Sequence, residues 1–305
     1  MQTPALMIDP RANGAPQSSP TPKPIYVDQP TIPRGGLIVI SGDSGVGKTH
    51  TIRQCLLDPQ WGPDKIRVSY AENPMATIGE DTGAKHFKRV RTIQEFVDDI
   101  ESLCAAKARG DAFPWSLMFL DSLTGLADYQ FMDYEDHPDR FISWNEKRGE
   151  MVKNEYAKYG DFGMKACRAC VRARDELGVD FVIFATTYGR PPIYTLPGNI
   201  VPQNLNRWSS VCAYMEAQLG DAPSAILAEI EAGRLKPGLH QSISTDENGR
   251  ADGKIVSRFF TTMNTGEVLA KGHRNLGMRE KAILPNLLRK IHSTQPNNQN
   301  KEVKA

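Results

Sequence analysis

Short runs of apolar and β-branched residues recur along the middle of the chain and predict buried strands. Their nearly continuous apolar character is typical of strands that are covered on both faces, as in a parallel sheet. The four clearest runs are Leu37–Ser41, Ile66–Tyr70, Leu117–Asp121 and Phe181–Thr186. Weaker candidates follow at 210–216 and 255–262, and the turn sequence at 264–266 predicts that the latter folds back through 267–271 as a C-terminal β-hairpin.

Helical patterns separate these strands. The first, over 48–57, ends at Asp58 and Pro59 because proline cannot continue a helix. Thr92 and Glu95 have the spacing of a capping box, and apolar residues recur behind them at helical intervals. A third helix is expected over about 145–177. Strands and helices therefore alternate in the order that predicts an α/β fold, with a mainly parallel sheet flanked by helices.

Composition divides the chain into a core and two flanking segments. Residues 1–34 contain eight prolines, which remove backbone donors and predict a flexible N-terminal arm. Residues 35–275 carry the α/β pattern, interrupted at about 220–253 by a polar, turn-rich stretch that we interpret as an insertion. Residues 276–305 are expected to form a basic tail, since 271–305 holds eight Lys or Arg and only two acids.

Charge and cysteine content exclude several classes of protein. The 305 residues carry 37 Lys plus Arg and 36 Asp plus Glu, so the total charge indicates no polyanionic or polycationic partner. No apolar run approaches the roughly 18 residues needed to cross a bilayer, and the N-terminus lacks the pattern of a secretory signal. The five scattered cysteines form no disulfide framework, and Cys167 and Cys170 are expected to be buried thiols. We expect a cytoplasmic protein without membrane association.

One sequence motif points to phosphate chemistry. Residues 42–49 match the phosphate-loop pattern of glycine, four residues, glycine, lysine and serine or threonine, between an expected strand and an expected helix. Glycines in such a loop let successive amides turn toward a phosphate. Lys48 is expected to contact the β- and γ-phosphates of ATP, and Thr49 to bind Mg²⁺. The residues expected to bind the nucleotide are Gly42, Asp43, Ser44, Gly45, Val46, Gly47, Lys48, Thr49 and His50.

Two acids at strand ends are expected to complete a catalytic site with Lys48. Asp121 ends a buried strand at the edge where open α/β sheets bind ligands, and we expect it to hold Mg²⁺ together with Thr49. Glu72 follows the second strand and is the expected base for the attacking water. The alternatives are that Glu72 is a solvated loop acid and that Asp121 or Ser122 lies closer to the water.

Strand ends and loops offer further candidates. Thr186 and Thr187 stand where a sensor of the γ-phosphate is expected, although they can also serve only strand-end hydrogen bonds. The segment 188–208 and the basic C-terminus are candidates for DNA contact, with a proline-rich surface loop and a solvated tail as the alternatives. The candidates for an arginine that acts on a neighbouring subunit's nucleotide are Arg190, Arg207 and Arg258, and the sequence does not choose among them. Residues 121–139, with six acids and no Lys or Arg, are expected to form an exposed loop.

The phosphate loop, Tyr70-Ala71-Glu72 and Leu120-Asp121-Ser122 resemble the RecA-like branch of the P-loop ATPases. The layout over about 25–291, including 156–163 and 258–271, is similar to AAA-type nucleotide-binding proteins encoded by tailed bacteriophages. The resemblance implies that residues 35–275 form a RecA-like, Mg²⁺-dependent ATPase domain in which Glu72 activates water. It also implies a role in phage DNA recombination, annealing or replication, with single-stranded DNA and further copies of the chain as partners in the host cytoplasm.

The chain departs from this family in two respects. The polar segment at 220–253 is additional, and no His or Gln stands at the expected sensor position. Two other functions fit the same phosphate loop. One is a nucleotide-gated accessory module for a helicase or a packaging machine, in which slow hydrolysis times an interaction. The other is a small-molecule or nucleotide kinase, which would need an arginine-rich lid that the sequence does not indicate.

Overall fold

Strand β1 (Leu37–Gly42) is buried along its whole length and lies within the sheet that organises the protein. Burial of six consecutive residues indicates that both faces of this strand are covered. The computed structural model describes residues 35–136, 142–145, 150–153, 155–188, 193–194, 204–205, 207–221, 228, 240–245, 251–262 and 270–293. The expected N-terminal arm, residues 1–34, lies outside the described residues.

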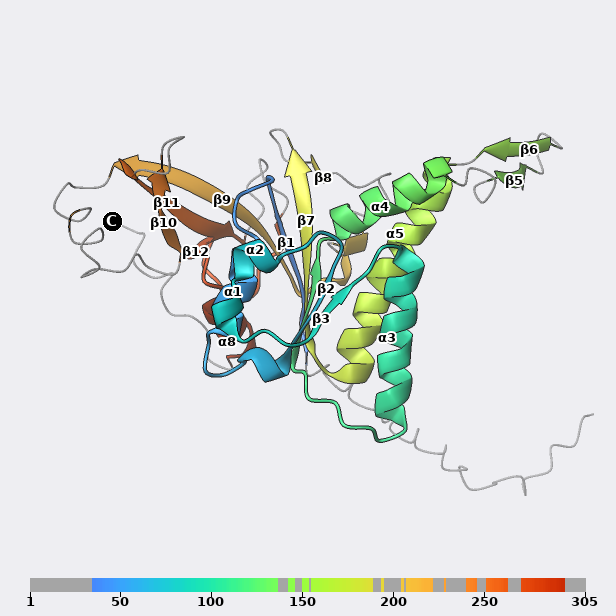
Figure 1. Ribbon diagram of the computed structural model, residues 1–305, viewed down its shortest axis with the longest axis horizontal. Coiled ribbons are helices and arrows are strands. Elements are labelled where there is room, and N and C mark those ends of the chain that lie inside the picture. The colour runs from blue at the N-terminus through green and yellow to red at the C-terminus, as the bar shows by residue number, and fades with distance from the viewer. Residues whose placement is uncertain are drawn as a thin grey trace, which may run out of the picture. The chain divides into compact units, whose positions relative to one another are not determined.

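The strands that follow join β1 in a mixed sheet. They are β2 (Ile66–Tyr70), β3 (Phe87–Arg89), β4 (Leu117–Asp121), β7 (Asp180–Tyr188), β8 (Ile193–Tyr194), β9 (Val211–Asp221), β10 (Gln241–Thr245), β11 (Ala251–Thr261) and β12 (Arg279–Lys281). Their order is β10-β11-β9-β1-β7-β4-β2-β3, with β8 beside β7 and β12 beside β11 (Figure 1). The strands from β9 to β3 are parallel to one another, whereas β8, β10, β11 and β12 pair in antiparallel fashion.

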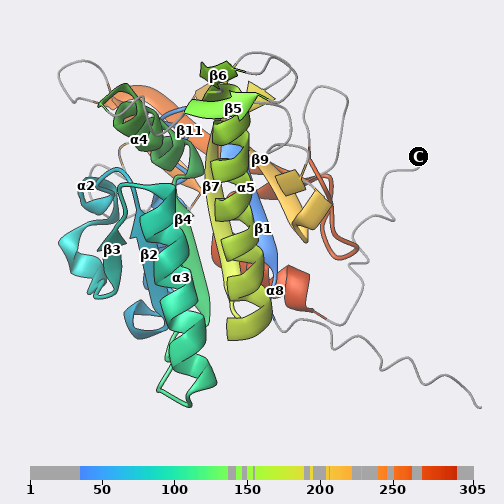
Figure 2. The same ribbon diagram turned by 90° about the vertical axis from the view of Figure 1, so that its right-hand side faces the viewer.

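Helices cover both faces of this sheet. They are α1 (His50–Leu56), α2 (Met75–Ile78), α3 (Ile93–Ala108), α4 (Leu123–Asp136), α5 (Glu155–Arg172) and α8 (Leu284–His292), with short 3-10 segments at Pro63–Lys65 and Glu80–Thr82 and a π-helical turn at Ala173–Leu177. Helices α3, α4 and α5 lie on one face, and α1, α2 and α8 on the other (Figure 1). Figure 2 shows α3 and α5 side by side in front of the sheet. The mostly parallel sheet with flanking helices confirms the expected α/β class.

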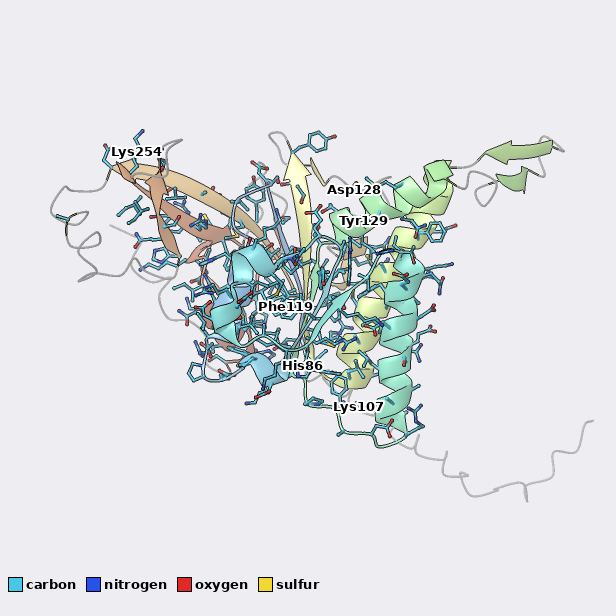
Figure 3. All side chains as sticks on the ribbon, in the orientation of Figure 1. His86, Lys107, Phe119, Asp128, Tyr129 and Lys254 are labelled. Atoms are coloured by element: carbon cyan, nitrogen blue, oxygen red, sulfur yellow. The ribbon has the colours of Figure 1, made fainter. Side chains whose placement is uncertain are left out.

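Side chains along β4 alternate between two apolar cores, as the pleat of a strand requires. Met118 and Leu120 enter the core beneath α3 and α5, and Leu117 and Phe119 enter the core beneath α1 and α8. Phe119, which Figure 3 places in the middle of the sheet, lies 5.9 Å from Phe184 between ring centroids. Full burial of one such side chain contributes roughly 1.5–3 kcal/mol to the stability of the folded state. The two cores therefore hold the strands in place, and with them the strand ends that carry polar residues.

The capping sequence before α3 works largely as expected. Thr92 Oγ1 accepts a hydrogen bond from the Glu95 amide at 3.1 Å, which satisfies a donor of the first helical turn. The Glu95 carboxylate reaches back to the amide of Arg91 at 2.7 Å, one residue before the amide that a capping box uses. Both contacts fix where this 16-residue helix begins.

Two segments differ from the sequence-based expectation. The helix expected over 145–177 begins at Glu155, because strands β5 (Ile142–Asn145) and β6 (Glu150–Lys153) pair before it. Their Ile, Trp and Val residues are types that favour strands. Residues expected to form an exposed acidic loop instead form α4, because Leu123 and Leu126 recur at helical spacing and are buried against the sheet.

The described parts of the C-terminal third form strands and a helix that the polar sequence did not indicate. Strand β10 lies in the stretch interpreted as an insertion, and β12 and α8 lie in the stretch interpreted as a basic tail. Helix α8 buries Leu284, Leu287, Leu288 and Ile291, whose spacing places them on one face. The turn expected at 264–266 lies outside the described residues, and Lys271 pairs with Cys212 of β9. No described helix has the length and apolar character needed to span a membrane.

Candidate functional site

A cavity of about 380 Å³ lies where the loops after β1, β2 and β4 meet the end of β7. Because these strands are parallel, their carboxyl ends converge at one edge of the sheet. The antiparallel strands β10 and β11 add a further wall. The lining residues are Ser44, Gly45, Gly47, Lys48, Thr49, His50, Glu72, Thr77, Asp121, Ser122, Thr186, Ser242 and Arg258.

The glycine-rich loop, residues 42–49, connects β1 to α1 and forms the floor of this cavity. Gly45 and Gly47 have φ values of +75° and +104°, which residues with a Cβ rarely adopt. A Cβ on Gly47 would also lie 2.8 Å from Nε of Arg258. Val46 between them is buried in the core beneath α1, so the loop is anchored by one apolar side chain and turned by the two glycines.

Lys48 is buried at the inner end of the loop. Its Nζ donates to the carbonyl oxygens of Gly42 at 2.7 Å and Asp43 at 2.9 Å. Burial lowers the pKa of Lys48 to about 8, and the negative charges of Asp121 and Asp43 oppose that shift. The ammonium is thus held by neutral carbonyls in a partly desolvated position, where an anionic ligand would stabilise its charge.

Thr49 and Asp121 meet across the sheet. Thr49 Oγ1 donates to Asp121 Oδ2 at 2.9 Å, although the two residues are 72 positions apart in the sequence. Burial raises the pKa of Asp121 to about 6, while the hydrogen bond from Thr49 and the charge of Lys48 lower it. This hydroxyl and carboxylate are among the oxygen ligands that Mg²⁺ takes in proteins.

The donor set fits a metal that is shared with a ligand. Within the described residues no group of three or more His, Cys, Asp or Glu is arranged to hold an ion. Mg²⁺ commonly binds one or two carboxylates and completes its shell with water and substrate phosphates. Thr49 and Asp121 therefore suit a magnesium ion carried by a phosphate ligand better than a metal held by the protein alone.

Glu72 lies at the outer rim of the cavity. Its side chain is exposed, in contrast to Asp121 deeper inside. Burial and the charge of Glu72 raise the pKa of Asp128, which Figure 3 shows on α4. The charge of Glu72 thus acts on both Asp121 and Asp128, and of Glu72 and Asp128 only Glu72 is among the described lining residues.

The two expected sensor threonines have different surroundings. Thr186 lines the cavity, and its hydroxyl accepts from Thr124 Oγ1 at 3.2 Å. The Thr124 hydroxyl also lies 3.0 Å from the hydroxyl of Ser122, the residue that follows Asp121. Thr187 donates to Asp43 Oδ1 at 3.3 Å, so it connects β7 to the glycine-rich loop. Thr186 is therefore the residue of the pair that can face a ligand.

Arg258 reaches the glycine-rich loop of its own chain. Its Nε donates to the Val46 carbonyl at 2.8 Å, and its Nη1 donates to Ser242 Oγ at 2.9 Å. Burial and then the charge of Arg258 lower the pKa of His50. We expected Arg258 to be a candidate for contact with a neighbouring subunit, whereas these bonds place it in the cavity of the same chain.

Among the other arginine and aromatic candidates, those with described side chains do not line the cavity. Arg207 is exposed and is not among the lining residues, and Arg190 lies outside the described residues. Trp208 packs against the core beneath α5, which leaves it unsuited to stack on a base. Tyr188, at the end of β7, is 57% exposed and retains a free aromatic surface. Cys167 and Cys170 are buried thiols, as expected.

Sequence reasoning missed Ser242, Thr124 and the in-chain position of Arg258. Ser242 lies in a polar stretch with no local signal of a strand, and its place in the cavity follows from the pairing of Ser242 with Val256 on β11. Such long-range pairing is not encoded in the spacing of neighbouring residues. Thr124 follows Asp121 by three positions, so the sequence could have predicted that it lies near the end of this strand.

Comparison with known proteins adds no assignment. No family model matches the sequence, and a search of curated proteins returns no significant match.

Proposed function

We propose that this protein is a RecA-like P-loop ATPase that binds and hydrolyses Mg²⁺-ATP at the glycine-rich loop. The observation that carries the proposal is the 2.9 Å hydrogen bond from Thr49 to Asp121, beside the buried Lys48. It joins the hydroxyl at the end of the loop to a carboxylate on another parallel strand, at the position where a phosphate-bound metal needs both. The matched sequence pattern and the cavity above the loop support the same proposal.

Lys48 and the loop amides bind the polyphosphate in this mechanism. Lys48 exchanges its bonds to the Gly42 and Asp43 carbonyls for bonds to the terminal phosphates, which restores a full counter-charge to the ammonium. Thr49 and Asp121 would hold the magnesium ion of the nucleotide. Mg²⁺, when bound, neutralises negative charge on the phosphoryl oxygens during transfer.

Glu72 accepts a proton from the attacking water. It lines the cavity at the rim beyond Asp121, where solvent enters and the terminal phosphate would be exposed. A carboxylate at this position can accept the proton of a water that attacks the terminal phosphate. Thr186, on the same side of the loop, donates a hydrogen bond to the terminal phosphate or to the water.

The DNA-related part of the proposal is carried by the resemblance to RecA-like phage proteins. We propose that single-stranded DNA binds near the segment after β7, where Tyr188 offers an exposed ring. We also propose that copies of the chain assemble on the DNA. The accessory-module and kinase functions remain the alternatives that the experiments below distinguish.

The nucleotide claim is tested by two substitutions and a control. Lys48→Ala is expected to abolish Mg²⁺-ATP binding in calorimetry, because the loop loses its one ammonium. Glu72→Gln is expected to keep ATP affinity while turnover falls roughly 10²- to 10⁴-fold, because the base is lost. Lys165→Ala, an exposed lysine on α5, should leave both unchanged. Unchanged binding in Lys48→Ala would refute the proposed site.

The partner claim is tested by titrating single-stranded DNA into the ATPase reaction. Stimulation of turnover supports a DNA-acting ATPase. A slow rate that DNA does not change supports the accessory module instead, and transfer of the γ-phosphate to a small-molecule hydroxyl supports the kinase. Either of the last two results would contradict the DNA part of the proposal while leaving the nucleotide site intact.

A further inference from the structure

Arg258 differs from every other arginine in the described part of the chain. The others are either exposed or ion-paired with a carboxylate, as Arg67 is with Asp99 at 2.9 Å. Arg258 is partly buried, and no carboxylate within the described residues forms an ion pair with it. A guanidinium withdrawn from water without a counter-charge is costly unless an anion joins it.

The direction from which Arg258 enters the cavity is set by the sheet order. β11 and β9 lie on one side of β1, and β7, β4 and β2 lie on the other. Arg258 therefore approaches the glycine-rich loop from the side opposite Asp121 and Glu72. In the proposed site, Thr49 and Asp121 would hold the magnesium ion and thus the terminal phosphate on the side of Asp121. A nucleotide that follows the loop would then have its nucleoside-proximal phosphates on the side of Arg258.

The backbone of Arg258 is held by two hydrogen bonds along one edge of β11, which fixes the origin of its side chain. Its amide donates to the His240 carbonyl at 2.8 Å, and its carbonyl accepts from the Ala282 amide at 3.0 Å. Nε and one Nη1 hydrogen are bonded to Val46 and Ser242. For the other three of the guanidinium's five N–H donors, the described part of the chain offers no hydrogen-bond partner in the cavity wall.

We propose that Arg258 is a nucleotide-binding residue that acts within its own chain and contacts the nucleoside-proximal phosphates. This inference rests on the proposed ATP site and extends it. A guanidinium matches the geometry of two phosphate oxygens, and a phosphate supplies the counter-charge that the protein does not. Because ATP and ADP share these phosphates, Arg258 strengthens binding of both nucleotides by the same factor.

The test measures ATP and ADP affinities by calorimetry for the wild type, Arg258→Ala and Arg258→Lys. Hydrogen bonds to charged groups are worth about 1.5–3 kcal/mol, so Arg258→Ala should weaken both nucleotides by roughly 10- to 150-fold. Arg258→Lys keeps the positive charge but loses the planar guanidinium, so its affinities for ATP and ADP should lie between those of the wild type and Arg258→Ala. Lys254→Ala removes a positive charge from the exposed tip of the same strand, and it should bind both nucleotides like the wild type (Figure 3).

A mixing experiment separates action within the chain from action on a neighbour. Arg258→Ala and Lys48→Ala subunits are combined, and ATPase activity is measured. If Arg258 serves its own chain, the mixture at subsaturating ATP shows no more activity than the Arg258→Ala subunits alone, because no single chain carries both residues. Recovery of activity would overturn the inference in favour of a neighbour's arginine.

The outcomes also separate this inference from the proposed function. If the wild type binds no nucleotide, the ATP site itself is refuted. If the wild type binds and Lys48→Ala does not, but Arg258→Ala binds ATP and ADP normally, only the inference fails. Thermal unfolding of the nucleotide-free Arg258→Ala protein checks that weakened binding does not reflect loss of the fold, and Arg258→Lys gives the same comparison if the alanine variant is unfolded.

Discussion

Thr49 shows how a single residue obtains its role from distant strands. Its hydroxyl is positioned by the end of the glycine-rich loop, and its acceptor Asp121 by the end of β4. β7 lies between β1 and β4, so the space between the two residues is closed from below by the end of β7, which carries Thr186. The metal pair is thus a product of sheet order rather than of a local motif.

Asp121→Asn tests this pair. The amide keeps an oxygen that accepts from Thr49, but it loses the charge that a divalent cation requires. We expect Mg²⁺-ATP affinity to fall by roughly 10- to 100-fold, with little change in ATP affinity when EDTA removes the metal. Titrations with and without Mg²⁺ provide the measurement. Equal losses in both conditions would show that Asp121 supports the loop and not the ion.

For single residues, the sequence pointed to Asp121 and to the glycine-rich loop but not to every residue that lines the cavity. Lys48, Thr49 and Asp121 stand in local patterns, a glycine-rich turn and the end of an apolar run, that translate directly into position. Ser242 and Arg258 reach the cavity only through strand pairing at the far side of β1. No spacing within a short window contains that information.

The elements of the parallel core were predictable because each is marked by one clear sequence pattern. The pattern is a nearly continuous apolar run for the strands and the preceding glycine-rich loop for α1. β2 and β4 have the expected bounds, and β1, β7 and α1 differ by a few residues. Helix α8 carried a comparable signal in the spacing of its four apolar residues, but the basic charges around it favoured the interpretation as a tail. Strand β10 had no such signal, since QSIST is polar at nearly every position.

Helix α8 is expected to contribute strongly to stability. Leu288 is fully buried in the core beneath α1, so Leu288→Ala removes packed side-chain volume. Such substitutions cost about 2–5 kcal/mol in the free energy of unfolding. Asn286→Ala, at an exposed position of the same helix, should change it by no more than about 0.5 kcal/mol. Urea unfolding measures both, and equal effects would place α8 outside the cooperative core.

Across the whole molecule, His292 connects the last helix to the beginning of the sheet. Asp180, the first residue of β7, accepts from His292 Nε2 at 2.8 Å and from the Gly36 amide at 2.7 Å. The hydrogen bond with Asp180 raises the pKa of His292 above its usual 6.5. The other titratable group that senses this charge is His273, whose pKa is lowered by burial, by Arg274 and by His292.

This contact predicts a pH-dependent contribution to stability. A histidine with a raised pKa binds its proton more tightly in the folded state, so the stabilisation is complete below about pH 6.5 and is lost as pH rises through the raised pKa. We expect the difference in unfolding free energy between the wild type and His292→Asn to shrink over this range. Urea unfolding at a series of pH values measures it, and a constant difference would contradict the assignment.

Gln54 of α1 joins the first and last parts of the described fold. Its Nε2 donates to the Ala282 carbonyl at 3.0 Å, its Oε1 accepts from the Leu284 amide at 2.9 Å, and Ala282 in turn bonds to Arg258. During synthesis the glycine-rich loop leaves the ribosome well before Ser242 and Arg258, which line the opposite wall of its cavity. A nascent chain stalled before β10 therefore lacks that wall, and ligand capture has to wait for the translation of β10 and β11.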